Sequence, residues 1–516
     1  LDNYRWAGNE CYMAQYEARM VHCLVPGLGM LVNSHPSLIN AQPLHHPHTE
    51  QQHRGYMSRL IDHGAGATSE YYGFETRAAQ NIQKGSEIFV SYGSEWFPER
   101  PEYAELPIKM NYDKADHIIK SFIDSQVGKS DLESSQEQWN TILNEMNALD
   151  RRTRAAMPED VGELSHAAEI GTARFFLPNF IRSMEWLRQN GQCMDNLIFG
   201  KSVIPQAGQG AFATRFISKG DLIAPAPLIH IDKDVLAMHR KINENDMIVE
   251  GDQLLLNYCF GHPKSSLLLF PYSSTVQFIN HSSKKANAKI QWSTSALHQQ
   301  QWLSDPLEEV KSRDKTGLMF DIIATRDVAL GEEVLLDYGH DWVASWEDHL
   351  QGQIPQEHNF ETASALNKDR DSAVKTLQEQ LSDPYLPDVE ITCIFEYEAK
   401  DDGKEEGENG LRYILKQWNL GLHWGIQGGK HHRPCDILSR KRFGKHYFYT
   451  ARVYNYDIMY EEQKIPDSSV LVVTKIPRWA IQFTEKSYSS NQHYENSFRQ
   501  PITIPDDLLP SHWLDL

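Results

Sequence analysis

Two short stretches decide the fold that this sequence predicts: Gln277-Phe-Ile-Asn-His-Ser-Ser-Lys-Lys-Ala-Asn-Ala288 and Glu333-Val-Leu-Leu-Asp-Tyr-Gly339. Both recur in the N-terminal part of the chain. The first stretch aligns without gaps on residues 30–41, and the second lies in a segment, residues 320–342, that aligns on residues 74–96. Because two dissimilar motifs recur in the same order, the sequence predicts an internal repeat in which each copy is one folded unit.

The identical positions of the two copies include Asn33 and Asn280, Asn40 and Asn287, Ala41 and Ala288, Gly85 and Gly331, Glu87 and Glu333, Tyr92 and Tyr338, Gly93 and Gly339, and Trp96 and Trp342. In each copy an alternating apolar segment follows a turn that contains glycine, which predicts a strand entered from a tight turn. In the second copy this strand ends at Tyr338, where a side chain can be presented to a site.

The segments outside the two copies differ in pattern. Apolar residues at helical spacing predict a helical connector over about residues 105–190 and a further helix near Val374, Leu377 and Leu381. From Ile391 onward the sequence is β-rich. The predicted division is a partial unit at 1–100, a helical connector at 101–194, a complete unit at 195–350, a helical linker at 351–390 and a β-rich C-terminal domain at 391–516.

Composition excludes several classes of protein. With 40% apolar and 23% charged residues, the 516-residue chain is typical of globular protein with several cores. The net charge of −20 disfavours nucleic acid and favours basic partners. The six cysteines show no metal-ligand spacing, so we expect no metal site and a reducing compartment, nuclear or cytoplasmic. The longest apolar stretch, Leu222–Ile231, is too short to span a membrane.

A glycine-rich turn lies upstream of the second copy. Residues 202–223 are typical of strand, turn, strand, turn and strand, with Gly208 and Gly210 in the first turn. Glycine lets the backbone approach a ligand closely. A single Gly-x-Gly is more often an ordinary hairpin turn, so these two glycines indicate a ligand site only together with the other motifs.

Taken in order, Gly208-x-Gly210, Phe278-Ile-Asn-His-Ser282 with Asn287, and Glu333–Gly339 resemble the signature of SET-domain methyltransferases. The last motif and its mate, Glu87–Gly93, are most similar to the branch that includes the plant Rubisco large-subunit methyltransferases. The resemblance implies a multidomain α+β fold with a β-rich, pseudoknotted SET domain. It also implies transfer of a methyl group from S-adenosylmethionine to a lysine side chain of a protein, either a histone or a non-histone protein.

The resemblance also implies roles for individual residues. Gly208 and Gly210 would cradle the methionine part of S-adenosylmethionine, and Asn280 and His281 would hold its amino group and adenine. Tyr338 would contact the cofactor and line the catalytic channel where the lysine meets the methyl group. Methyl transfer from a sulfonium needs a neutral amine, alignment and exclusion of water, but no metal.

Two further tyrosines, Tyr258 and Tyr272, are candidates for the wall of the lysine channel, although Tyr272 fits an apolar core equally well. His281 could act through its main chain alone, and Tyr338 could be a packing tyrosine. Ser283 stands where many SET domains carry cysteine, and no Cys-x-Cys cluster follows Tyr338. We therefore expect no zinc-closed channel, and its wall must come from elsewhere in the chain.

Three alternatives stay open at the level of sequence. The chain could be a catalytically inactive SET-fold interaction scaffold. Basic stretches at Lys430–Arg433 and Arg440–Arg442 could bind nucleic acid, but a solvated face is the better interpretation in an acidic chain. The first copy has only 32 residues before Asn33, whereas Gly208 lies 72 residues before Asn280, so we expect the first copy to lack the cofactor-binding half.

Overall fold

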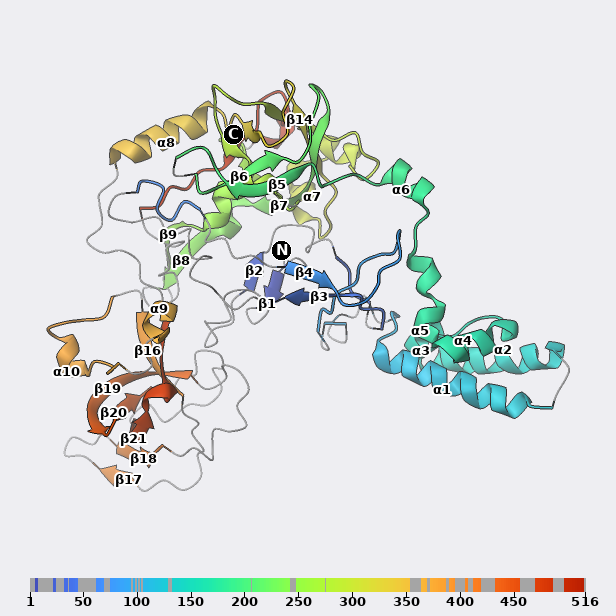
Figure 1. The fold of residues 1–516 in the computed structure, drawn as a ribbon, viewed down its shortest axis with the longest axis horizontal. Coiled ribbons are helices and arrows are strands. Elements are labelled where there is room, and N and C mark those ends of the chain that lie inside the picture. The colour runs from blue at the N-terminus through green and yellow to red at the C-terminus, as the bar shows by residue number, and fades with distance from the viewer. Residues whose placement is uncertain are drawn as a thin grey trace. The chain divides into compact units, whose positions relative to one another are not determined.

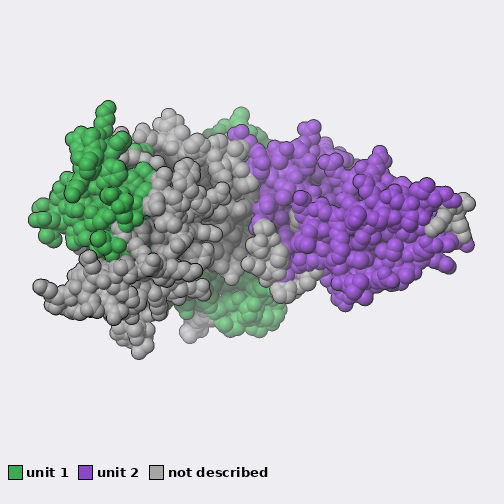
Figure 2. Space-filling view, turned by 90° about the horizontal axis from the view of Figure 1, so that it is seen from below, with its two compact units in different colours: residues 1–27, 47–73, 194–516 green, residues 28–46, 74–193 purple. Residues whose placement is uncertain are grey.

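The computed structural model forms two compact units. Unit 1 comprises Leu1–Gly27, Pro47–Gly73 and Met194–Leu516, and unit 2 comprises Leu28–His46 and Phe74–Cys193 (Figure 2). The structure describes residues 5–7, 22–24, 32–35, 37–44, 62–68, 75–93, 96–97, 100, 103, 105–128, 132–205, 207–241, 247–273, 275–352, 363–368, 372–386, 389–394, 404–406, 412–418, 432–454, 469–485 and 496–514.

Unit 2 combines a short hairpin with a helical bundle (Figure 1). Its elements are β3 (Ala41–Leu44), β4 (Glu75–Ala78), α1 (Lys109–Gln126), α2 (Leu132–Leu149), α3 (Arg151–Ala155), α4 (Leu164–Ile170), α5 (Thr172–Phe175) and α6 (Met184–Asn190). Apolar residues at helical spacing, including Ile119, Trp139 and Leu143, form its core. The helices predicted between residues 105 and 190 are confirmed, because their apolar faces pack against one another.

The β-rich part of unit 1 contains two sheets. Its strands are β5 (Leu197–Lys201), β6 (Gln209–Ala213), β7 (Leu222–Asp232), β10 (Phe260–Gly261), β11 (Leu267–Pro271), β12 (Asn280–His281), β13 (Ala288–Trp292), β14 (Met319–Ala324), β15 (Glu333–Leu336) and β23 (Ile502–Thr503). One sheet has the order β13-β14-β7-β11-β10-β23 and the other the order β12-β15-β6-β5. A hairpin of β8 (Ala237–Lys241) and β9 (Met247–Asp252) is separate. The predicted α+β class is confirmed in outline.

The last residues of the chain complete this β-rich core. Strand β23 pairs in parallel with β10, and the fully buried Trp513 donates from Nε1 to the Asp305 carbonyl oxygen over 2.9 Å. Ile502 and Ile504 lie in the same apolar cluster as Phe320. Residues 498–513, which the sequence places in the C-terminal domain 391–516, therefore pack beside strands that precede them by more than 150 residues.

A separate C-terminal sheet has seven strands in the order β17-β18-β21-β20-β19-β16-β22. They are β16 (Val389–Ile394), β17 (Lys404–Glu406), β18 (Arg412–Gln417), β19 (His432–Phe443), β20 (His446–Val453), β21 (Ser469–Pro477) and β22 (Ile481–Glu485). All pairs are antiparallel except β18 with β21. The predicted β-rich character is confirmed.

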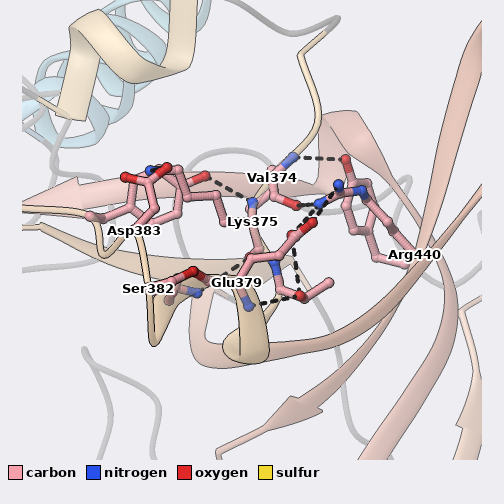
Figure 3. Close-up of polar contacts among 10 residues, drawn as sticks. Val374, Lys375, Glu379, Ser382, Asp383 and Arg440 are labelled. Carbon is pink, nitrogen blue, oxygen red and sulfur yellow. Dashed lines mark hydrogen bonds and ion pairs between the residues drawn. The ribbon is translucent and has the colours of Figure 1, made fainter.

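The linker helix predicted near Val374 is shorter than expected. Only α10 (Leu377–Gln380) is helical there, between α9 (Ala363–Lys368) and β16. Thr376 and Glu379 form a capping box, and Arg440 of β19 binds Glu379 while donating to the Val374 carbonyl oxygen (Figure 3). Val374 is fully buried in the core of the C-terminal sheet, and residues 373–376 form no helix.

Cys393 of β16 and Cys435 of β19 form a disulfide. Strands β16 and β19 are neighbours in the sheet, and their pairing brings the two Cα atoms to 5.8 Å, within the range that a disulfide requires. The expectation of reduced cysteines is wrong for this pair, because a separation of 42 residues gives no sequence signal of their proximity.

Candidate functional site

The sequence motifs converge on the buried carboxylate of Glu333. This side chain is 5% exposed, and its two oxygens accept hydrogen bonds from three partners. Ser202 Oγ lies 2.7 Å from Oε1, the Val203 backbone nitrogen lies 2.9 Å from Oε2, and Asn280 Nδ2 lies 3.1 Å from Oε1. A buried carboxylate needs such partners, since an unpaired one would be costly. Glu333 therefore fixes the glycine-rich hairpin to the Asn280 segment.

Asn280 uses its amide nitrogen within the protein and leaves its oxygen available. Nδ2 donates to the Gln209 carbonyl oxygen over 2.8 Å in addition to Glu333. Within the described ranges, no group donates a hydrogen bond to Asn280 Oδ1. The orientation of the amide is thus set by two acceptors of the Nδ2 group, the Gln209 carbonyl oxygen and Glu333 Oε1, and Oδ1 can accept a hydrogen bond from a bound ligand.

Glycine is required at positions 208 and 210 of the predicted turn for different structural reasons. Gly208 has φ +70°, and a Cβ built on it would meet no atom within 4 Å, so its backbone conformation demands glycine and the space beside it is open. A Cβ on Gly210 would lie 2.2 Å from Glu333 Oε1. Gly210 therefore serves the close approach of β6 to the Glu333 carboxylate, which sequence reasoning did not foresee.

Strand β12 carries Asn280 and His281 directly beside the final motif. It pairs in parallel with β15, with Asn280 opposite Leu335 and His281 opposite Leu336. The fully buried Asn287 strengthens this pairing, since its Nδ2 donates to the Glu333 carbonyl oxygen over 2.9 Å and its Oδ1 accepts from the Leu335 nitrogen over 2.8 Å. The Asn-His segment and the strand leading to Tyr338 are thus held in one register.

Tyr338 is half-buried and directs its hydroxyl at the backbone of the Asn280 segment. The hydroxyl donates to the Ile279 carbonyl oxygen over 2.5 Å. Burial, and then the neighbouring Tyr258, raise the pKa of the Tyr338 hydroxyl. The tyrosine is therefore neutral near neutral pH, with its proton held by Ile279 and its oxygen lone pairs able to accept a hydrogen bond.

His281 acts as a neutral acceptor in this arrangement. Its Nδ1 accepts from the Tyr338 backbone nitrogen over 3.0 Å, and this contact requires that Nδ1 carries no proton. Burial lowers the pKa of His281, although Asp337, 3.9 Å from Nδ1, raises it. The ring also packs on Trp342, with centroids 4.9 Å apart. The imidazole thus orients the end of the Tyr338 strand.

The two candidate channel tyrosines have different surroundings. Tyr258 ends the short 3-10 helix Leu254–Tyr258 and lies near enough to Tyr338 to raise the pKa of that hydroxyl. Tyr272 is 5% exposed, and its hydroxyl lies 3.2 Å from Thr316 Oγ1. The structure therefore brings Tyr258 together with Tyr338, and it places Tyr272 in the core, which was the alternative interpretation.

Sequence reasoning missed the residues that cover the other side of Tyr338. The Thr503 nitrogen donates to the Tyr338 carbonyl oxygen over 3.0 Å. On α8 (His340–Gly352), Trp342 lies 5.1 Å from the Tyr338 ring and 5.3 Å from the Phe498 ring, measured between centroids. No sequence signal could have connected Phe498 and Thr503 to Tyr338, because more than 150 residues separate them.

The N-terminal copy has hydrogen bonds at the positions that match those of the second copy. Asn33 forms a parallel bridge with Phe89, as Asn280 does with Leu335. Asn33 Nδ2 donates to Glu87 Oε1 over 2.7 Å, as Asn280 Nδ2 donates to Glu333 Oε1 over 3.1 Å. Asn40 Nδ2 donates to the Glu87 carbonyl oxygen over 2.9 Å, as Asn287 Nδ2 donates to the Glu333 carbonyl oxygen over 2.9 Å. The Tyr92 hydroxyl donates to the Val32 carbonyl oxygen over 2.6 Å, as the Tyr338 hydroxyl donates to the Ile279 carbonyl oxygen over 2.5 Å.

The two copies differ at histidine. His35, which aligns with Ser282, is 9% exposed, and its Nε2 lies 3.0 Å from the Tyr112 hydroxyl of α1. Its ring also packs against Phe89 and Phe180. Burial lowers the pKa of His35 to about 4. The histidine of the first copy is therefore a core residue that joins the motif to the helical bundle.

The described residues were searched for metal-binding groups and for membrane-spanning helices, and neither is found among them. No group of three or more His, Cys, Asp and Glu side chains among them could hold a metal ion. Searching the same residues finds no helix with the length and apolarity needed to cross a membrane.

Comparison with known proteins identifies the central part of the chain. Among solved structures, similarity extends to a candidate histone methyltransferase of Plasmodium falciparum, which is 19% identical, with 29% of this chain and 99% of that chain covered and a TM-score of 0.19. The Chaetomium thermophilum polycomb repressive complex 2 is 19% identical, with 29% of this chain and 16% of that chain covered and a TM-score of 0.20.

A third similar structure is KRYPTONITE in complex with mCHH DNA, an H3(1–15) peptide and SAH. It is 18% identical, with 30% of this chain and 25% of that chain covered and a TM-score of 0.19. This chain thus spans a quarter or less of the KRYPTONITE and polycomb chains that it matches. No curated protein matches the sequence. Residues 208–339 match the family model of the SET domain, and the chain therefore contains a SET domain that includes Gly208, Asn280 and Tyr338.

Proposed function

We propose that this protein transfers a methyl group from S-adenosylmethionine to a lysine side chain of another protein. One observation carries the proposal: parallel pairing of β12 with β15 unites the Asn280 amide, the His281 ring and the Tyr338 hydroxyl in a single hydrogen-bonded frame. The SET-domain match covers the same residues. A site for methyl transfer needs this combination of a rigid cofactor pocket and an adjacent polar group for the amine.

Gly208 and Asn280 are the proposed cofactor-binding residues. The open space beside Gly208 and the available Asn280 Oδ1 fit a ligand that brings a backbone-like amino group. Gly210 contributes indirectly, because it lets Glu333 approach and hold the amide of Asn280. His281 would face the cofactor through its main chain, since its Nδ1 is engaged by Tyr338. The bound cofactor supplies an electrophilic methyl group.

Tyr338 is the proposed catalytic residue. Its hydroxyl proton is held by the Ile279 carbonyl, so the oxygen can accept a hydrogen bond from the lysine amine and direct the nitrogen lone pair. Tyr338 is not the base, because its raised pKa favours the neutral form and the oxygen carries no negative charge to accept a proton. A lysine in this enclosed site loses its proton more easily than in water, since burial disfavours the charged amine.

The proposed catalytic unit combines residues 195–350 with the C-terminal residues 497–514. Phe498 and Thr503 pack against the Tyr338 side of the site and reduce its contact with water. Enclosure of this kind protects a methyl donor from hydrolysis and strengthens polar contacts. The helical connector 101–194 and linker 351–390 would support it, and the C-terminal sheet would form a further domain.

We also propose that the N-terminal copy is a repeated half of a SET unit without catalytic activity. The matched hydrogen bonds of Asn33, Asn40 and Tyr92 support a common origin of the two copies. His35 is committed to the core through the contact of its Nε2 with the Tyr112 hydroxyl. The motif style points to the branch of the plant Rubisco large-subunit methyltransferases and to non-histone substrates.

The nucleic-acid alternative receives no support from the C-terminal sheet. Arg440 forms an ion pair with Glu379 through Nη2 and Oε1 at 2.7 Å (Figure 3), and Arg433 is 3% exposed. Lys430 and His431 lie outside the described residues. Lys441 and Arg442 are exposed, and Arg442 Nε donates to the Gly444 carbonyl oxygen over 3.0 Å, which fits the solvated face favoured by the acidic sequence.

Labelling would decide between an enzyme and an inactive scaffold. The protein is incubated with radiolabelled S-adenosylmethionine and whole-cell extract, and labelled lysines are mapped by mass spectrometry. A Tyr338→Phe variant serves as the comparison. Labelled lysines that depend on the intact Tyr338 would support the enzyme. A wild-type protein that neither binds the cofactor at micromolar concentration nor labels any protein would be a scaffold.

A further inference from the structure

Residues 62–68, Asp-His-Gly-Ala-Gly-Ala-Thr, form a segment that we name the small-residue strap. In the sequence the strap lies between the two motifs of the N-terminal copy, but it belongs to unit 1, the unit that contains the SET domain. Ala65 is 1% exposed, and Gly64 and Gly66 are also buried. Gly66 has φ +76°, which few other residues adopt without strain. Small side chains allow the strap backbone to approach the SET domain closely.

Three side chains of unit 1 hold carbonyl oxygens of the strap. His349 Nε2 lies 2.8 Å from the His63 oxygen, Arg499 Nη1 lies 2.7 Å from the Gly66 oxygen, and Asn257 Nδ2 lies 2.9 Å from the Ala67 oxygen. Because a carbonyl oxygen can only accept, each side chain is the donor. The three donors come from different parts of unit 1: His349 from α8, Asn257 from the 3-10 helix Leu254–Tyr258, and Arg499 from the C-terminal segment.

Arg499 connects the strap to the end of β9 and to the backbone of its own neighbour, Phe498. Its Nε donates to the Asp252 oxygen at the end of β9 over 3.0 Å, and Nη1 donates to the Phe498 oxygen over 2.8 Å. Burial lowers the pKa of Arg499 to about 10, although Tyr258 and then Asp252 raise it, so the guanidinium stays charged at neutral pH. A planar guanidinium with five donors can join several carbonyls in a fixed geometry.

These contacts lead to residues that surround Tyr338. Asn257 directly precedes Tyr258, and besides the strap it binds the Phe498 oxygen over 2.9 Å and the Gln500 nitrogen over 2.9 Å. The Phe498 ring packs on Trp342, which in turn packs on Tyr338. The strap thus contacts Asn257, the neighbour of Tyr258, and Asn257 links it to Phe498, whose ring reaches Tyr338 by way of Trp342.

We propose that Arg499 is a positioning residue that fixes the small-residue strap as a wall of the lysine channel, and that this wall determines which protein segments enter. The proposal rests on the proposed methyl transfer. In a chain without a Cys-x-Cys cluster after Tyr338, the strap would form the part of the channel wall that a zinc site forms elsewhere. A small shift of such a wall changes how a substrate is aligned, while the Gly208 and Asn280 pocket for the cofactor stays in place.

The test compares Arg499→Gln and Arg499→Lys in the full chain, with Arg188→Gln as a matched control. Arg188 is 69% exposed and pairs only with Glu185 among the described residues. With a labelled protein substrate, Arg499→Gln should raise KM at least tenfold, change kcat less than threefold and leave the cofactor Kd within twofold. Arg499→Lys keeps the charge but donates from one point, so we expect an intermediate KM. The control should match the wild type.

A second variant and a second measurement separate positioning from stability. Gly66→Val strains the strap backbone itself and should reproduce the rise in KM, measured below the onset of unfolding. In Arg499→Gln, the rate of amide hydrogen exchange should increase in residues 62–68 and stay the same in β15.

Two results would overturn the inference alone: an unchanged KM in Arg499→Gln with faster exchange in the strap, or a rise in KM accompanied by parallel losses of cofactor affinity and melting temperature. Absence of methylation by the wild-type protein would overturn the proposed function, and this inference with it.

Discussion

The Tyr338 hydroxyl donates its proton to the Ile279 carbonyl oxygen, one residue before Asn280, over 2.5 Å. This hydrogen bond ties the proposed catalytic residue to the proposed cofactor pocket. A displacement of either one is therefore transmitted to the other. Since burial raises the pKa of the hydroxyl, the contact persists across the physiological pH range.

Tyr338→Phe should lower kcat at least tenfold, on the order of 1.4 kcal/mol, because the lysine amine loses its acceptor. Single-turnover methylation measures this effect, and calorimetry should show a cofactor affinity close to that of the wild type. The matched control is Tyr92→Phe, which removes the corresponding hydrogen bond to Val32 in the first copy. Equal turnover of wild type and Tyr338→Phe would remove the hydroxyl from the mechanism.

Asn280→Ala should weaken the binding of S-adenosylmethionine by roughly 1 to 3 kcal/mol, because the cofactor amino group loses the Oδ1 acceptor. The variant also leaves one hydrogen bond of the Glu333 carboxylate unmade, while Ser202 and Val203 retain theirs. Isothermal calorimetry measures the affinity, and circular dichroism verifies the fold. A folded variant that binds as tightly as the wild type would show that another group holds the amino group.

One cofactor should bind per chain, because the histidine of the N-terminal segment, His35, is engaged in the core by the Tyr112 hydroxyl. Equilibrium dialysis with labelled S-adenosylmethionine measures the stoichiometry. Asn33→Ala should leave the binding unchanged, although Asn33 forms the same contact with Glu87 that Asn280 forms with Glu333. Two sites per chain, or loss of binding with Asn33→Ala, would identify the first copy as a working domain.

Unit 2 should lose stability on acidification through His35. Its pKa is about 4 in the folded protein and near 6.5 when unfolded, so both states are neutral above pH 6.5. Below that pH the unfolded state binds the proton first, and the free energy of unfolding falls by about 3 kcal/mol by pH 4. The largest cause is burial of the ring, which disfavours its charged form.

The measurement for His35 compares the thermal unfolding of wild type and His35→Gln by calorimetry at pH 7 and pH 5. The buried His298 and the half-buried His230 and His281 also have lowered pKa values, so both proteins should lose stability on acidification. The loss should be smaller in His35→Gln. Parallel losses would mean that His35 is solvated or partnered in its charged form.

The sequence by itself determined the local parts of this protein. Helical spacing around Trp139 and Ile119 predicted the bundle of unit 2, because a periodic apolar face requires only nearby residues. The alternation that leads to Tyr338 predicted β15, and the order of the Gly208, Asn280 and Tyr338 motifs predicted the SET domain. In each case the signal lies within a few residues of the element.

Only the tertiary structure decided which distant residues complete the site. Phe498 and Thr503 reach the Tyr338 region across more than 150 residues, and the neighbouring Arg499 binds the strap at 62–68. Backbone carbonyls of the strap and a single β23 pairing carry these contacts. Backbone groups are the same in every residue, so no sequence pattern reveals which of them will meet.

The two glycines show the same division within one motif. The left-handed conformation of Gly208 is a local property that a turn sequence can predict. The need for Gly210 arises because Glu333, which lies 123 residues later, would come within 2.2 Å of a Cβ. The local sequence therefore predicts the backbone conformation at Gly208. The requirement for glycine at position 210 depends on close packing between strands that are far apart in the sequence.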